Sequence, residues 1–305
     1  MVDLAGAHDL ARSFGRRATG HDPGPLTAVA SQSSHVFVGA DIVVKLAEHH
    51  RLDREVRLVG DLPEALTPKL IASGLETVDT RPVQFACYLR APGVSPGMGL
   101  PGVDPATARS LASQAVRRLA LLHEWHPPQD ASRVLREPLD HGGFTSRDAL
   151  VSLVERLVST DRERVVRRIL MDGLATIAQQ APVAARADVP VHADCYWDNW
   201  LACDGTVTAL LDFEWARFGD PLDDYHFLIS FSGEHVQTVL DVIAHEAAIP
   251  PQTLRRECEV REASFLVSDL VLALDGDEGD LTRRLLARRL DSLEQLVVGQ
   301  RWRQR

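Results

Sequence analysis

Side chains that could hold a metal ion and activate a nucleophile are concentrated between residues 191 and 224. Within VHADCYWDNW and LLDFEW, the polar residues Asp194, Asn199 and Asp212 lie on the loops and ends of a predicted small hairpin. Three short strands connected by a loop and a turn can bring such residues to one point. We therefore expect their side-chain oxygens to lie close together. Oxygen ligands suit a hard cation such as Mg²⁺, which proteins usually hold with one or two carboxylates plus substrate phosphates. Asp194 would then be left to act on a nucleophile.

Three short strands are predicted to position these residues. Their apolar patterns place them at residues 189–193, 200–203 and 207–211. Asp204-Gly205 between the last two is a strong hairpin signal, because these residue types tolerate positive φ. The alternative is that the acidic and amide side chains only cap turns, as Asp and Asn often do.

The segment resembles the catalytic core of the aminoglycoside phosphotransferases and related kinase-like small-molecule phosphotransferases. His192-x-Asp194-x4-Asn199 resembles their catalytic loop, and Asp212-Phe213-Glu214 resembles their metal-binding motif. The resemblance covers roughly residues 26 to 232. Further matching residues occur in the expected order along the chain: Lys45, Arg54-Glu55, Leu122-His123 and Asp220-Pro221.

The resemblance implies ATP and Mg²⁺ as cofactors and a role for each matched residue. Asp194 would accept a proton from a substrate hydroxyl, and His192 would brace the loop rather than react. Asn199 and Asp212 would hold Mg²⁺ across the ATP phosphates. The remaining matches would bind the nucleotide: Lys45 on the α and β phosphates, Glu55 as its ion-pair partner, and the backbone around Leu89 and Ala91 at the adenine.

The sequence departs from the family pattern at two places. Ser31, Ser33 and Ser34 occupy the turn where a glycine-rich loop would cover the phosphates, although backbone N–H groups and hydroxyls can also cradle phosphate. Tyr196-Trp197-Asp198 stands where the family commonly has His-Pro-Gly. Trp197 could stack on a substrate or pack in the core, and Asp198 could bind a substrate amine or make a turn hydrogen bond. Glu214 could assist the metal, contact the substrate or only make a hydrogen bond.

The elements indicate an α+β chain with two lobes, as the protein-kinase-like resemblance implies. A short helix ending near Arg17, strands at 26–30, 34–38, 42–46, 69–72 and 83–89, and a helix at 51–62 are predicted for residues 1–91. The lobe formed by residues 1–91 would be a mainly antiparallel sheet plus a helix that binds the nucleotide. The Pro- and Gly-rich APGVSPGMGLPG that follows is predicted to connect the lobes.

Residues 92–305 change to helical periodicity. Asp104-Pro105 predicts the start of a helix, and residues 160–163 spell a capping box before another. Further helices are predicted near 220–232, 235–248, 252–275 and 280–302. We expect this lobe to hold the catalytic loop, the metal site and the substrate site.

Composition and charge exclude several classes of protein. A net charge of −10 argues against nucleic acid as a partner, and residues 93–305 contribute −9 of it. An acidic surface could attract a cationic substrate or only keep the protein soluble. No run approaches the ~18 apolar residues that a membrane span needs, and the four cysteines show no CxxC spacing. We therefore expect a cytoplasmic protein with reduced thiols and no membrane partner.

The leading functional hypothesis is an ATP- and Mg²⁺-dependent kinase that phosphorylates a hydroxyl of a small polar molecule, with an aminoglycoside-like or other cationic antibiotic favoured. A metabolite kinase of the choline, homoserine or sugar type would use the same catalytic set. Two further hypotheses are a catalytically dead nucleotide-binding module and a metallohydrolase that uses His192, Asp194 and Asp212. The metallohydrolase would need more histidine ligands, and the sequence has none at ligand spacing nearby. The sequence predicts no oligomeric state.

Overall fold

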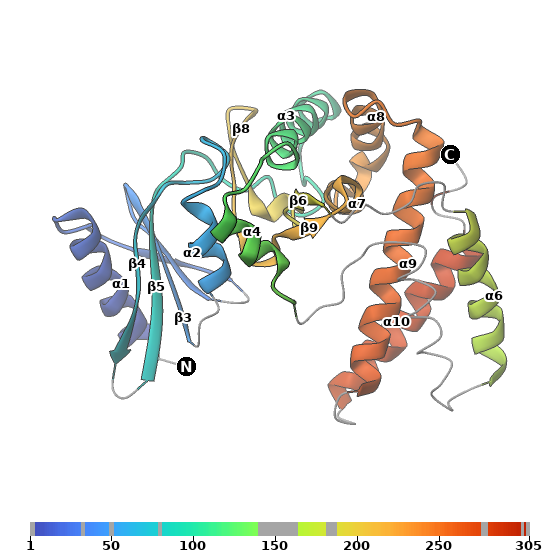
Figure 1. Cartoon of the computed structure of the whole chain (residues 1–305), viewed down its shortest axis with the longest axis horizontal. Helices are drawn as coiled ribbons and strands as arrows, with labels where there is room; N and C mark the ends of the chain where they lie inside the picture. The colour runs from blue at the N-terminus through green and yellow to red at the C-terminus, as the bar shows by residue number, and fades with distance from the viewer. Residues whose placement is uncertain are drawn as a thin grey trace.

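The structure is a computed structural model that describes residues 4–31, 34–48, 52–78, 81–139, 164–180, 188–275, 280–299 and 302. An antiparallel sheet lies at one end and a group of long helices at the other, with short strands between them (Figure 1). The predicted α+β class is confirmed.

The N-terminal sheet has five antiparallel strands in the order β1-β2-β3-β5-β4. Each predicted strand is present, although β4 extends six residues beyond its predicted end. The turn between β2 and β3 is closed by Gly39, whose N–H donates to Ile42 O at 2.8 Å. The strands are β1 (Thr27–Val29), β2 (His35–Val38), β3 (Ile42–Glu48), β4 (Leu70–Val78) and β5 (Arg81–Leu89).

Two helices cover opposite faces of this sheet. The apolar side of α1 (Leu4–Thr19) packs on one face, where Phe14 stacks on Phe85 with ring centroids 4.2 Å apart. The other face packs against α2 (Asp53–Val59). Because side chains alternate along a strand, Val44 of β3 faces α1, whereas Lys45 projects to the side of α2.

The segment that leaves β5 is docked along a hairpin of the helical part. Val94 and Ala202 exchange backbone hydrogen bonds of 3.0 and 2.9 Å, and Thr208 Oγ1 donates to Pro92 O at 2.6 Å. Gly93 permits this approach with φ of +104°, because a Cβ there would lie 2.3 Å from Ala202 O. These bonds hold the connecting segment against the hairpin of residues 200–210. The predicted lobe boundary between residues 91 and 92 stays a prediction.

Gly93→Ala is expected to lower the free energy of unfolding by about 3 kcal/mol, since it adds a backbone clash to a left-handed conformation. Gly102→Ala is the matched control, because its φ is +72° but nothing lies within 4 Å of the added Cβ. It should cost about 1 kcal/mol. Urea denaturation of both variants measures the difference. Equal losses of unfolding free energy would contradict the close contact between Gly93 and Ala202.

The described part of residues 92–305 is mainly helical, as predicted. Asp104 caps α3 by accepting hydrogen bonds from Ala106 N and Thr107 N. The predicted capping box at 160–163 lies outside the described residues, and α4 is a helix that the sequence did not predict. None of the described helices is both long and apolar enough to cross a membrane. The helices are α3 (Pro105–His123), α4 (Gln129–Arg136), α6 (Arg164–Gln180), α7 (Pro221–Ser230), α8 (Val236–Glu246), α9 (Pro251–Asp275) and α10 (Asp280–Gly299).

Two small antiparallel pairs lie between the sheet and these helices. The predicted hairpin is confirmed as β7 (Trp200–Cys203) and β8 (Thr206–Leu210), with Asp204 and Gly205 in the turn at φ of +49° and +73°. The strand before the catalytic loop, β6 (Val189–Val191), pairs with β9 (Arg217–Gly219), which the sequence did not predict.

Candidate active site

A partly buried lysine joins the N-terminal sheet to the remainder of the site. Lys45 Nζ donates to both carboxylate oxygens of Glu55 at 2.9 Å and to Asp212 Oδ1 at 3.1 Å. Burial alone would lower the pKa of Lys45, but the two carboxylates outweigh it and hold that pKa above its usual value. Tyr88 adds a hydrogen bond of 2.7 Å to Glu55. The predicted Lys45–Glu55 pair is present, and it also reaches Asp212.

Asn199 and Asp194 are in contact within the loop after β6. Asn199 closes a 3₁₀ turn, η1 (Trp197–Asn199), and its Nδ2 donates to Asp194 O at 2.7 Å and to Asp194 Oδ2 at 3.2 Å. With the amide nitrogen so engaged, the amide oxygen is the atom that Asn199 can offer to a ligand. Burial, followed by the charges of Asp212 and Glu214, raises the pKa of Asp194 to about 8.

Asp212 precedes the turn η2 (Phe213–Trp215) and has a left-handed conformation with φ of +68°. This conformation is uncommon for a residue with a side chain, and such strain is often found at functional sites. The preceding residue connects it to the catalytic loop, since Leu211 N donates to Asn199 O and Leu211 O contacts His192 Nε2, both at 2.8 Å. These backbone bonds place Asp212 next to the loop that holds Asn199, and the roles of both residues stay predictions.

His192 lies in the core beside these residues. It is 0% exposed, and its ring meets Phe213 edge-on with centroids 4.6 Å apart. Burial lowers the pKa of His192, which favours a neutral ring. These contacts suit the predicted bracing role better than proton transfer to a substrate.

The oxygen atoms that the site could offer as ligands are of the kind that bind Mg²⁺. The amide oxygen of Asn199 and the carboxylate of Asp212 are hard ligands, and the mutual repulsion of Asp212, Glu214 and Asp194 is what a cation would relieve. Among the described residues, no three His, Cys, Asp or Glu side chains are grouped as a metal site. Mg²⁺ usually keeps several waters and takes other ligands from substrate phosphates, so an ion held by these two oxygens would complete its coordination in that way.

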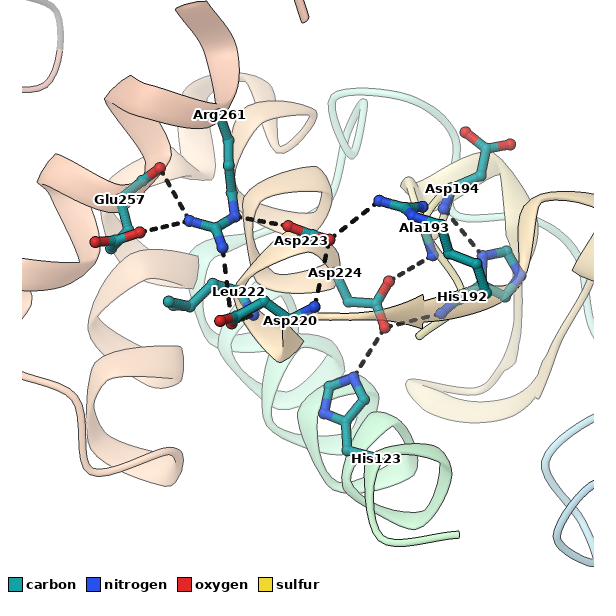
Figure 2. Close-up of polar contacts among 11 residues, drawn as sticks. His123, His192, Ala193, Asp194, Asp220, Leu222, Asp223, Asp224, Glu257 and Arg261 are labelled. Carbon is teal, nitrogen blue, oxygen red and sulfur yellow. Dashed lines mark hydrogen bonds and ion pairs between the residues drawn. The ribbon is translucent and has the colours of Figure 1, made fainter. Parts of the chain in front are cut away.

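Asp224 holds the start of the catalytic loop, as Figure 2 shows. Its carboxylate accepts hydrogen bonds from Ala193 N at 2.7 Å and His192 N at 3.0 Å, and it contacts His123 Nε2 at 2.9 Å. Sequence analysis missed this residue, although it matched His123. The available signal was the acidic first turn of α7, Asp223-Asp224, three residues after Asp220.

The neighbouring carboxylate, Asp223, points the opposite way toward α9 (Figure 2). Arg261, which is 1% exposed, donates to Asp223 at 2.8 Å and to Glu257 at 2.6 Å. Arg217 of β9 donates to Asp223 at 3.0 Å. The first turn of α7 is thereby fixed between α9 and the strand that pairs with β6.

Asp224→Asn is expected to lower the free energy of unfolding at pH 7 by about 2–4 kcal/mol. The NH₂ group of the amide would replace one carboxylate oxygen and would face buried N–H groups that need an acceptor. Burial alone would raise the pKa of Asp224, but the bond and charge of His123 and the bonds from the loop hold it below its usual value. The stabilisation is therefore present above the unfolded carboxyl pKa and is lost as the pH falls toward the folded one.

Urea denaturation across the acid range checks this, with Asp241→Asn on the exposed side of α8 as control. A variant that tracks the wild-type pH dependence would contradict the role of Asp224.

The predicted contacts with the base and with the phosphate-covering loop lie at the end of β5 and in the turn between β1 and β2. Leu89 ends β5 and is 44% exposed, and Ala91 follows it with intermediate exposure. Ser31 is exposed and Ser34 is partly buried in the turn between β1 and β2, whereas Ser33 lies outside the described residues. Their roles stay predictions.

The structure corrects one substrate candidate and redefines another. Trp197 is 0% exposed and donates its indole N–H to Ser232 Oγ at 2.8 Å, so its ring packs in the core and offers no face to a substrate. Asp198 is exposed, but it accepts a hydrogen bond from Met98 N at 2.8 Å and so ties down the connecting segment. Glu214 is partly exposed near Asp194, whose pKa it raises.

The antiparallel sheet with its Lys45–Glu55 pair, followed by short strands and helices that hold Asp194, Asn199 and Asp212, has the arrangement of the kinase-like phosphotransferases. Residues 25–260 match the model of the phosphotransferase enzyme family, and the chain belongs to that family. The predicted family and enzyme class are confirmed. No curated protein matches the chain in sequence.

Solved structures share the fold over nearly the whole chain. The wild-type aminoglycoside 2'-phosphotransferase-IIIa in its GDP complex is 18% identical with a TM-score of 0.72, covering 95% of this chain and 99% of that one. A macrolide 2'-phosphotransferase from Brachybacterium faecium is 19% identical with a TM-score of 0.63, covering 95% and 98%. An aminoglycoside phosphotransferase in a ternary complex with ADP and hygromycin B is 17% identical with a TM-score of 0.61, covering 94% and 97%. These similarities confirm the predicted kinase-like fold.

Proposed function

We propose that this enzyme transfers the γ-phosphoryl group of ATP to a hydroxyl of a small polar molecule. The observation that carries the proposal is the junction at Lys45, which binds Glu55 and Asp212 at once, with Asp212 tied through Leu211 to the loop that contains Asp194. Phosphoryl transfer needs groups placed in this way, because the protein mainly positions the reactants and neutralises charge.

Asp194 is the proposed proton acceptor. The substrate oxygen forms a bond to the γ-phosphorus, the bond from that phosphorus to the bridging oxygen breaks, and ADP leaves with the electron pair. The hydroxyl proton passes to a carboxylate oxygen of Asp194. Burial and the charges of Asp212 and Glu214 raise the pKa of Asp194, and a cation bound at Asp212 would offset those charges and favour the carboxylate form that accepts the proton.

Asn199 and Asp212 are the proposed ligands of Mg²⁺, through an amide oxygen and a carboxylate. The ion would neutralise negative charge on the phosphates. Lys45 would bind the α and β phosphates, with Glu55 and Tyr88 fixing its position. Ser31, Ser33 and Ser34 would line the phosphates, and the backbone at Leu89 and Ala91 would bind the base. GTP is the alternative donor, because the 2'-phosphotransferase of the same fold is a GDP complex.

An aminoglycoside-like or other cationic antibiotic is the favoured acceptor. The support is the charge of −9 on residues 93–305 and the kanamycin and hygromycin B complexes among similar structures. Asp198 and Glu214 are the acidic candidates for contact with such a substrate. A macrolide or a choline, homoserine or sugar-type metabolite is the alternative, since the catalytic groups would be the same. We place the enzyme in the cytoplasm, where its nucleotide donor would be supplied.

The test is nucleotide consumption by the purified chain with Mg²⁺ and either ATP or GTP across aminoglycosides, macrolides, amino alcohols and sugars. A gain of about 80 Da on one compound, the mass of a transferred phosphoryl group, is expected. Nucleotide binding without any product would favour the dead binding module. Absence of nucleotide binding would overturn the proposal.

A further inference from the structure

Arg54 of α2 makes three hydrogen bonds that the proposed chemistry does not use. Its Nη1 donates to Ala216 O at 2.8 Å and to Val134 O at 2.9 Å, and its Nη2 donates to Glu137 O at 2.8 Å. The acceptors belong to the end of α4 and to the residue that follows η2. One side chain therefore joins α2 to two segments of the helical part, and α2 and α4 lie side by side in Figure 1.

The acceptors at the end of α4 suit a guanidinium group. Val134 and Glu137 offer carbonyls at the C-terminus of that helix, where the helix dipole favours a cation, and Val134 O also accepts a hydrogen bond from Glu137 N at 3.1 Å. The planar fork of an arginine can donate from two nitrogens in fixed directions, whereas a lysine has one nitrogen. Arg54 is therefore matched to this place in geometry as well as in charge.

These bonds complete a closed ring around η2. Asp212, which precedes η2, binds Lys45, and Ala216, which follows η2, accepts from Arg54. Lys45 in turn binds Glu55, the residue next to Arg54 in α2. Both ends of η2 are thus held by α2, once directly and once through Lys45.

We propose that Arg54 is a positioning residue that fixes α2 against η2 and so sets the geometry of Lys45, Glu55 and Asp212 before nucleotide binds. The inference rests on the proposed function for its kinetic consequence only. Its structural consequence is that α2 and η2 move together, so that loss of Arg54 loosens both.

Hydrogen exchange tests the structural consequence without any turnover. Arg54→Met is expected to speed the exchange of amides in residues 53–59 and 213–216 by about tenfold or more, because local opening no longer breaks the three bonds. Arg57→Met is the matched control: Arg57 lies one turn further along α2, is 44% exposed, and pairs only with the Glu137 side chain in the bonds seen. A surface pair of this kind contributes little, so exchange should stay within about twofold. Unchanged exchange in Arg54→Met, or equal changes in both variants, would overturn the proposal.

Kinetics test the link to Glu55. Arg54→Met is expected to lower kcat/KM by about 10- to 100-fold, the effect of a small misplacement of reacting groups. In a Glu55→Gln background the same change should cost less than about threefold, because the contact that Arg54 positions is already weakened. Equal losses in both backgrounds would overturn the proposal.

Arg54→Lys is the second variant should the Met variant fail to fold, and it is expected to show intermediate effects in both experiments. A lysine variant indistinguishable from wild type in exchange would overturn the proposal. Absence of turnover in the wild-type enzyme would instead contradict the proposed function, and the exchange experiment would still decide the role of Arg54.

Discussion

Asp194→Asn is expected to lower kcat by about 10²–10⁴, the usual loss when a positioned proton acceptor is removed. The amide has the same shape, so the contact with Asn199 and the fold of the loop should persist. Nucleotide affinity should change little, because Asp194 acts on the acceptor hydroxyl in the proposed reaction. Initial-rate assays with saturating nucleotide and acceptor measure kcat. Calorimetric titration with ATP measures nucleotide affinity separately.

The control for this variant is Asp204→Asn in the turn between β7 and β8. It makes the same chemical change at an exposed residue with φ of +49°, a conformation that Asn tolerates well. Its turnover should match the wild type. If the Asp194→Asn enzyme is as active as this control, Asp194 is not the proton acceptor.

Asp212→Asn is expected to lower kcat by about 10²–10³, comparable to the loss of one preorganised group that stabilises transition-state charge. Asparagine fits the left-handed backbone at φ of +68°, so the change removes charge with little added strain. It weakens both the proposed Mg²⁺ ligand and the partner of Lys45.

The readout specific to this residue is the dependence of nucleotide binding on Mg²⁺. The wild type should bind ATP more tightly with Mg²⁺ than without it, and Asp212→Asn should lose most of that difference. Asp241→Asn, an exposed carboxylate on α8, is the matched control and should behave as wild type. If Asp212→Asn retains the full Mg²⁺ effect, the metal is held elsewhere.

The strands and the catalytic constellation were predictable because local patterns specify them. The resemblance to the family motifs singled out Lys45 and Asn199, and it agrees with the presence of only two lysines and one asparagine in the sequence. The hairpin turn at Asp204-Gly205 fixed the register that brings Asp212 back to the loop. Family motifs, together with spacing and turn chemistry, therefore carried the prediction of the site.

Contacts between distant segments were not predictable in this way. His123 and Asp224 are 101 residues apart, and Asp223 and Arg261 are 38 apart, with no periodicity to relate them. Arg54 binds backbone carbonyls, which every residue possesses, so its partners leave no mark in the sequence. The sequence could not decide between substrate contact and core packing for Trp197, because an aromatic residue near such a loop has the same sequence pattern whether it is buried or exposed.

Short elements were missed for a further reason. β9 has three residues and α4 has eight, too few to show a clear apolar repeat. Both nevertheless support the site, since β9 pairs with the strand before His192 and α4 ends at the carbonyls that bind Arg54. Tertiary contacts, rather than local preference, hold them in place.

The measurement that tests the central claim most directly follows the γ-phosphoryl group itself. Nucleotide labelled with heavy oxygen in that group is incubated with the enzyme, Mg²⁺ and the acceptor found in the compound panel, and the product is analysed by mass. Direct phosphoryl transfer predicts a product that carries the labelled phosphoryl group in the wild type and is formed far more slowly by Asp194→Asn. Label found only in free phosphate, or a nucleotide joined to the acceptor, would contradict the account.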